Sequence, residues 1–87
     1  MYSKKYILEH IEEFRVHNPV YDDLINAVCY PAYFNVGERG WFLANTNKWF
    51  DKAHRIHTSV IENVEYLEDR IIVTTQNTRF TFVLVNQ

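Results

Sequence analysis

Residues 64–84, VEYLEDRIIVTTQNTRFTFVL, predict a three-stranded antiparallel meander. A turn at residues 68–69 places Tyr66 opposite Ile71, and a second turn near residues 76–78 returns the chain for the third strand. Every second side chain then faces the same side of the sheet. The side chains of that face are all apolar or aromatic: Val64, Tyr66, Ile71, Val73, Phe80, Phe82 and Leu84. We therefore predict that this face is buried in the core.

The opposite face of the meander is only partly polar. A face in contact with water is expected to be mostly polar, but Ile72, Val83 and Val85 interrupt it. We expect a covering element, which would be either the predicted helical hairpin or another chain. Homodimerisation through these three residues or through the edge of the last strand would supply the second. The alternative is that they are ordinary, singly exposed apolar side chains.

The N-terminal third predicts a helical hairpin over residues 1–31. Ser3 is a suitable N-cap, and apolar residues follow it at helical spacing: Ile7, Leu8, Ile11 and Phe14. The dipeptide Asn18-Pro19 predicts the end of the first helix and the start of a second. The second helix would bury Val20, Leu24, Ala27 and Val28. Pro31 would end it.

From Gly40 onward, apolar side chains recur at every second residue, which is the spacing typical of a β-strand. Residues 41–45 predict one strand, and residues 49–58 predict another with an irregular start. The sequence thus predicts a single α+β domain over residues 1–87. Its N-terminal helical hairpin would pack on a bent antiparallel sheet of four or five strands over residues 40–87, resembling an SH3-like or partial barrel. Further core residues would be Ile7, Ile11, Phe14, Leu24 and Val28.

Composition excludes several classes of protein. The chain has 87 residues, 47% of them hydrophobic and 23% charged, and a net charge of −2. This balance fits one folded domain and argues against a strongly basic nucleic-acid-binding protein. The single cysteine, Cys29, excludes an intrachain disulfide and a cysteine-based zinc site. No apolar run approaches the roughly 18 residues of a membrane span. The single cysteine fits a reducing compartment, so we expect a cytoplasmic protein. We expect no cofactor.

The residues that could support catalysis do not form a recognisable pattern. His54 and His57 lie three apart on a predicted strand and would face opposite sides, so no metal site is predicted. A small enzyme using His57 with Ser59 or Asp51 is an alternative that needs a pocket joining them. Nothing in the chain resembles a nucleophile turn or a phosphate-binding loop. We therefore expect a protein that is not an enzyme.

Aromatic residues are clustered where the two halves of the chain meet. Seven of the fourteen lie within residues 30–50, and adjacent pairs such as Trp41-Phe42 cannot both face inward on a strand. Basic residues alternate with them, and the predicted binding surface consists of Arg39, Trp41, Trp49, Phe50, Lys52 and Arg55. Such residues anchor protein interfaces, so the sequence predicts a protein-binding module with a protein partner. Binding of single-stranded nucleic acid is the alternative, and the net negative charge makes it the less favoured one.

Two stretches carry a resemblance to a known group of proteins. HRIHTSVIENV at residues 54–64, followed by IIVTTQNTRFTF at residues 71–82, resembles short uncharacterised β-rich proteins of phages and mobile elements of Gram-positive bacteria. The resemblance covers about the last third of the chain. It implies an accessory protein of a mobile element or an inhibitor of a host system, and it supplies no catalytic residue.

Overall fold

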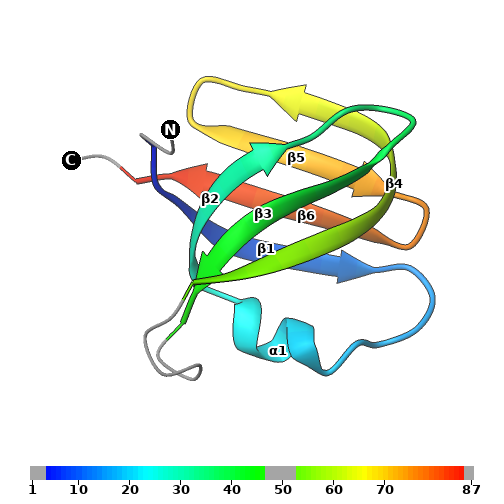
Figure 1. The fold of residues 1–87 in the computed structure, drawn as a ribbon, viewed down its shortest axis with the longest axis horizontal. Helices are drawn as coiled ribbons and strands as arrows, with labels where there is room; N and C mark the ends of the chain where they lie inside the picture. The colour runs from blue at the N-terminus through cyan, green and yellow to red at the C-terminus, as the bar shows by residue number, and fades with distance from the viewer. Residues whose placement is uncertain (1–3, 47–52, 86–87) are drawn as a thin grey trace.

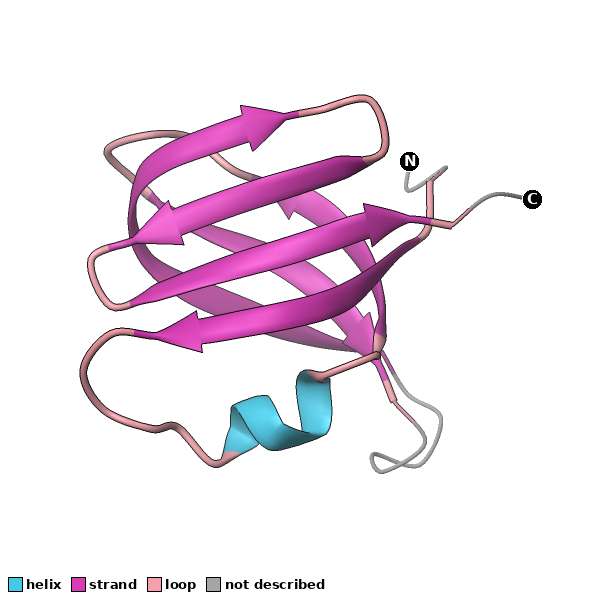
Figure 2. Ribbon diagram, turned by 180° about the vertical axis from the view of Figure 1, so that it is seen from behind, coloured by secondary structure: helices cyan, strands magenta, loops and turns pink. Residues whose placement is uncertain are grey.

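Six antiparallel strands form a closed barrel in the computed structural model of the chain, which describes residues 4–46 and 53–85 (Figure 1). The strands are arranged around the barrel in chain order, and the last pairs with the first. They are β1 (Tyr6–Glu13), β2 (Val28–Tyr33), β3 (Arg39–Asn45), β4 (Ala53–Tyr66), β5 (Arg70–Thr75) and β6 (Thr78–Leu84). A short helix, α1 (Val20–Leu24), lies between β1 and β2 in the chain and next to β1 in space (Figure 2).

The predicted C-terminal meander is confirmed, including its register. Tyr66 pairs with Ile71 across β4 and β5, and Ile71 pairs with Phe82 across β5 and β6. The predicted face points into the barrel, where Ile71 and Phe82 are buried together with Val73 and Phe80. Tyr66 is the exception, because its side chain is 66% exposed at the end of β4.

Phenylalanine rings fill the interior of the barrel. The ring centroid of Phe82 lies 5.0 Å from that of Phe42, 5.6 Å from that of Phe34 and 6.2 Å from that of Phe80. Leu8 and other small or aliphatic side chains complete the core. Of the core residues predicted in the N-terminal third, Leu24 is fully buried, Ile7, Ile11 and Val28 are half-buried, and Phe14 is 43% exposed. The predicted burial of Phe14, Val20 and Tyr66 is therefore wrong. The predicted core positions of Ile7 and Val28 are also wrong, because the two pair with each other, Ile7 pairs with the outward Val83, and neither packs against the core.

The predicted first helix is wrong, because residues 6–13 form strand β1. β1 pairs with β6, and a bulge shifts the register between Leu8 and His10. The bulge brings Leu8 opposite Phe82 and Ile11 opposite Phe80, so two residues three apart both face the interior. This spacing matches one helical face and explains the error.

The predicted second helix is correct at its start and wrong in its length. Asn18 Oδ1 accepts a hydrogen bond from the Val20 N–H at 3.1 Å, as expected of a residue that caps a helix. The helix ends at Leu24, because Ile25 is extended and Asn26 adopts a positive φ of 67°. Residues 28–33 then form β2. The α+β class with a helical hairpin over residues 1–31 is therefore replaced by a nearly all-β barrel.

Barrel closure removes one of the two predicted routes to a dimer. β6 pairs with β5 on one side and with β1 on the other, so the last strand offers no free edge. Ile72 and Val83 alternate with buried neighbours and point outward, and both are half-buried. Val85 follows β6, and its N–H donates to the carbonyl of Lys5 at 3.0 Å. A dimer through these three residues stays a prediction.

Candidate functional site

The outer surface of β2, β3 and β4 gathers aromatic and basic side chains. The inward residues of β3, Phe42 and Ala44, are fully buried, so Trp41 and Leu43 point outward. The register places their neighbours on the two flanking strands. One row is Tyr33, Trp41 and His57, and the next is Tyr30, Leu43 and Arg55. We call these six residues together with Arg39 the β2–β4 face.

Both arginines of the β2–β4 face are held in place. The guanidinium carbon of Arg55 lies 4.4 Å from the ring centroid of Trp41, which is a cation–π contact. Arg39 Nε donates a hydrogen bond to the backbone carbonyl of Thr58 at 3.0 Å. Each guanidinium retains further N–H groups for an external acceptor, because arginine carries five donors.

Gly40 lets β3 pass close to β2 between Arg39 and Trp41. A Cβ atom at Gly40 would lie 2.5 Å from the backbone oxygen of Tyr33 and 2.7 Å from Ile61 Cδ1. The Gly40 N–H donates to the buried hydroxyl of Thr58 at 3.0 Å. The absence of a side chain at this position therefore allows the close approach of β3 to β2 between two residues of the face.

The charge of the β2–β4 face is mainly positive. Arg39 and Arg55 supply its two cations. At the rim, the Tyr33 hydroxyl donates to Glu38 Oε1 at 2.9 Å, and Asn35 donates to Glu38 Oε2 at 3.1 Å. The hydrogen bond to Glu38 raises the pKa of Tyr33. Tyr33 is thereby fixed as a neutral donor at the border of the face.

Half of the predicted binding surface comes together here. Arg39, Trp41 and Arg55 lie on the β2–β4 face, whereas Trp49, Phe50 and Lys52 fall outside the described residues. Tyr30 and Tyr33 belong to the aromatic cluster in the sequence. They are absent from the predicted surface because the sequence predicts a helix up to Pro31, whereas both residues lie on strand β2. The alternation of outward Tyr30 with buried Cys29 is the signal that could have revealed it.

The structure does not join the residues of the alternative enzyme site. Ser59 Oγ accepts a hydrogen bond from Asn77 Nδ2 at 3.0 Å, whereas His57 is paired in register with Trp41. No hydrogen bond links His57 to Ser59 in the part of the chain that the structure describes, and Asp51 lies outside it. Among residues 4–46 and 53–85, no group of three His, Cys, Asp or Glu side chains is placed to hold a metal ion.

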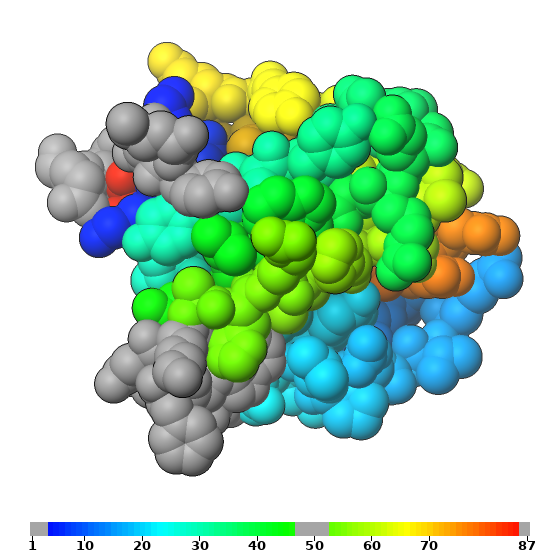
Figure 3. Space-filling view, viewed as in Figure 1, coloured from blue at the N-terminus to red at the C-terminus, as the bar shows by residue number. Residues whose placement is uncertain are grey.

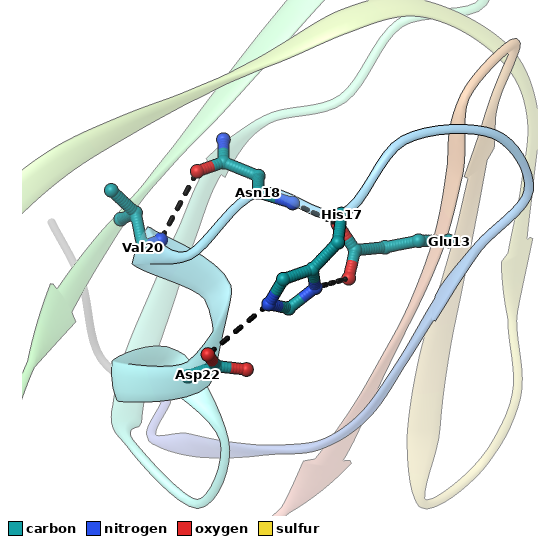
Figure 4. A network of polar contacts seen from close by, with 5 residues as sticks. All are labelled: Glu13, His17, Asn18, Val20 and Asp22. Atoms are coloured by element: carbon teal, nitrogen blue, oxygen red, sulfur yellow. Dashed lines mark hydrogen bonds and ion pairs between the residues drawn. The ribbon is translucent and has the colours of Figure 1, made fainter.

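A second polar cluster holds the connection between β1 and α1 (Figure 4). His17 Nδ1 lies 2.7 Å from Glu13 Oε1, and His17 Nε2 lies 3.1 Å from Asp22 Oδ2. The Asn18 N–H donates to Glu13 Oε2 at 2.6 Å. This backbone hydrogen bond lowers the pKa of Glu13, and the hydrogen bond to Glu13 raises the pKa of His17. With a carboxylate at each ring nitrogen, His17 is stabilised as the doubly protonated imidazolium.

Comparisons with other proteins add no family to this description. No protein-family model, curated protein or solved structure matches the chain. The fold and the β2–β4 face therefore define the class, a small six-stranded antiparallel β-barrel with a basic and aromatic outer face. Within the described residues, no helix is long and apolar enough to cross a membrane.

Proposed function

We propose that this barrel is a non-enzymatic binding module that engages an acidic segment of another protein through the β2–β4 face. The observation that carries the proposal is the placement of Trp41 under Arg55, with Tyr30, Tyr33 and Leu43 beside them on neighbouring strands. Trp, Tyr and Arg are the residues most enriched among those that dominate binding energy at protein interfaces.

The chemistry of the face supports an acidic partner. Arginine pairs with a carboxylate through two parallel N–H donors, and it can do so while its plane stacks on an aromatic ring. Arg55 is already held over the ring of Trp41, so little further side-chain freedom is lost when a carboxylate binds. Arg39 extends the positive charge along the same surface, which favours encounter with a negatively charged segment.

Protein binding is favoured over binding of single-stranded nucleic acid. Base stacking requires an open aromatic face, and Arg55 covers a face of Trp41. Affinity for nucleic acid also depends on many phosphate contacts, and the chain as a whole carries a net charge of −2. The resemblance to proteins of phages and mobile elements leads us to propose a protein of the host cell as the partner.

The test uses short extended peptides rich in Asp and Glu, selected on the wild-type protein and measured by isothermal titration calorimetry. Arg55→Glu should weaken binding at least about tenfold, because it removes a charge-assisted hydrogen bond and adds repulsion between two negative charges. The matched control is Arg79→Glu. The guanidinium carbon of Arg79 also lies over an aromatic ring, 5.6 Å from the ring centroid of Phe14, but on another face of the barrel. Its replacement should leave the affinity unchanged.

Two outcomes would overturn the proposal. One is an equal loss of peptide affinity in the Arg55 and Arg79 variants, which would indicate nonspecific attraction of charge. The other is tight binding of oligothymidine that weakens steeply with salt and is lost in Arg55→Glu, while acidic peptides do not bind. That result would assign the β2–β4 face to nucleic acid.

A further inference from the structure

A pocket of about 540 Å³ lies between the β1–α1 connection and one end of the barrel. This volume is in the range of small-molecule sites. Figure 3 shows the two walls next to each other at the right of the molecule, the segment before α1 in blue to cyan and the β5–β6 turn in orange. The lining residues are Arg15, Val16, His17, Asn18, Pro19, Tyr21, Ser59, Asn77 and Thr78.

Among the described residues, the charges around this pocket leave the Arg15 guanidinium without an ion-pair partner. Arg15 and His17 line it, and none of its lining residues is acidic. The charge of His17 is matched by Glu13 and Asp22, which hydrogen bond to its two ring nitrogens. Arg15 forms no ion pair within the described residues. An anion is therefore the ligand that completes the electrostatics of the pocket.

The pocket also offers neutral hydrogen-bond donors and an apolar wall. Ser59 Oγ accepts from Asn77 Nδ2, so the Ser59 hydroxyl proton and the second amide proton of Asn77 can be donated to a ligand. Val16, which is 81% exposed, and Pro19 both line the pocket and give it an apolar part. A ligand with an anionic end and an apolar body fits both walls.

The walls are pinned in place without a ligand. At one end, the Phe14 N–H donates to the carbonyl of Asn77 at 2.9 Å, and Glu13 holds both His17 and the Asn18 N–H. At the other end, the ring of Tyr21 packs edge-on against Phe80 with centroids 5.6 Å apart. A pocket fixed in this way loses little conformational entropy when a ligand enters.

We propose that this pocket binds a small organic oxyanion, a carboxylate or a phosphate monoester attached to an apolar group. Arg15 pairs with the oxyanion, and Ser59 and Asn77 donate to it. The apolar group lies against Val16 and Pro19. This site is independent of the β2–β4 face, and its occupation does not require the protein partner.

The experiment is an NMR titration of the backbone amides with phenyl phosphate, with benzoate and with uncharged benzyl alcohol. Saturable shifts should appear at Ser59, Asn77 and Thr78, with a dissociation constant of about 1 mM, as expected of fragments this small. The stronger of the two anions identifies the headgroup, and benzyl alcohol should bind at least about tenfold more weakly.

Two variants and a control make the result specific. Arg15→Gln should weaken anion binding about tenfold or more, and Ser59→Ala by a smaller factor. Arg70→Gln is the control, because Arg70 belongs to the β4–β5 hairpin and pairs with Asp69 away from the pocket. The proposal is overturned if neither anion gives a saturable shift at these amides. It is also overturned if benzyl alcohol binds as well as the anions, or if Arg15→Gln and Arg70→Gln have equal effects.

Discussion

Replacing Phe82 by alanine tests the closed barrel at its centre. Phe82 is fully buried, and three other phenylalanine rings lie within 6.2 Å of its centroid. Truncating a buried phenylalanine costs about 3–5 kcal/mol, from lost transfer energy and from the cavity left behind. A domain of this length has a total stability of roughly 4–13 kcal/mol. Phe82→Ala should therefore remove a large part of it and lower the melting temperature by at least about 12 °C.

The assay is urea unfolding followed by tryptophan fluorescence, with Tyr66→Ala as the matched control. Tyr66, Ile71 and Phe82 form one row across β4, β5 and β6. A flat three-stranded sheet with one buried face would bury both aromatic ends of this row. Of these two aromatic residues the barrel buries Phe82 and leaves Tyr66 exposed, so Tyr66→Ala should cost less than about 1 kcal/mol. A loss below about 1 kcal/mol for Phe82→Ala, or equal losses for the two variants, would refute the reasoning.

Three further predictions concern single positions. Gly40→Ala should destabilise the barrel by about 1–3 kcal/mol in urea melts, because its methyl group would meet a backbone carbonyl of β2 at 2.5 Å. The control is Gly37→Ala, which is strained by its φ of 91° but meets no atom within 4 Å. A larger loss of stability in Gly37→Ala than in Gly40→Ala would contradict the prediction. Burial raises the pKa of Cys29 to about 12, so its thiol should react with Ellman's reagent only after unfolding, and rapid native labelling would disprove its burial. Because the pKa of His17 is raised in the fold, its protonation stabilises the fold fully below the ordinary pKa of 6.5, and this stabilisation is lost as pH rises through the folded pKa. Because the pKa of Glu13 is lowered in the fold, its ionisation stabilises the fold above the ordinary pKa of 4.5, and this stabilisation is lost as pH falls through the folded pKa. The melting temperature should therefore decline above about pH 6.5 in the wild type and less so in His17→Gln; the same slope in both would exclude this network as the cause.

The C-terminal meander could be predicted because its signal is local. Turn residues near positions 68–69 and 76–78 set the register, and three strands of alternating residues agreed on one face. The sequence could not show that this sheet closes into a barrel, because closure depends on pairing between β6 and β1, which are far apart in the chain. The exposure of Tyr66 follows from its place at the end of β4, which periodicity does not indicate.

The N-terminal third was predicted wrongly because a bulged strand imitates a helix. The bulge between Leu8 and His10 places Leu8 and Ile11 on one side, which is the spacing expected of a helical face. Pro31 is typical of a helix stop, but it lies inside β2. Among the described residues, β2 pairs with β1 only at Cys29 and Val28, so the remainder of β2 is edge-like on that side, where proline is tolerated.

The candidate site was predictable in composition but not in arrangement. Trp41 and Phe42 face opposite sides of β3, as their adjacency predicts, because Phe42 is fully buried and Trp41 points outward. The contact of Arg55 with Trp41 depends on the pairing of β3 with β4, with residues 47–52 between them. The contribution of Tyr30 could not be found without strand β2.

The most direct test of the β2–β4 face is to map where a selected acidic peptide binds. Backbone amide shifts are followed in an NMR titration of the intact chain with that peptide. We predict that the perturbed amides cluster at Tyr33, Trp41 and His57 and at their neighbours on β2, β3 and β4. Perturbations centred instead on Ile72 and Val83, on the outer surface of β5 and β6, would contradict the account.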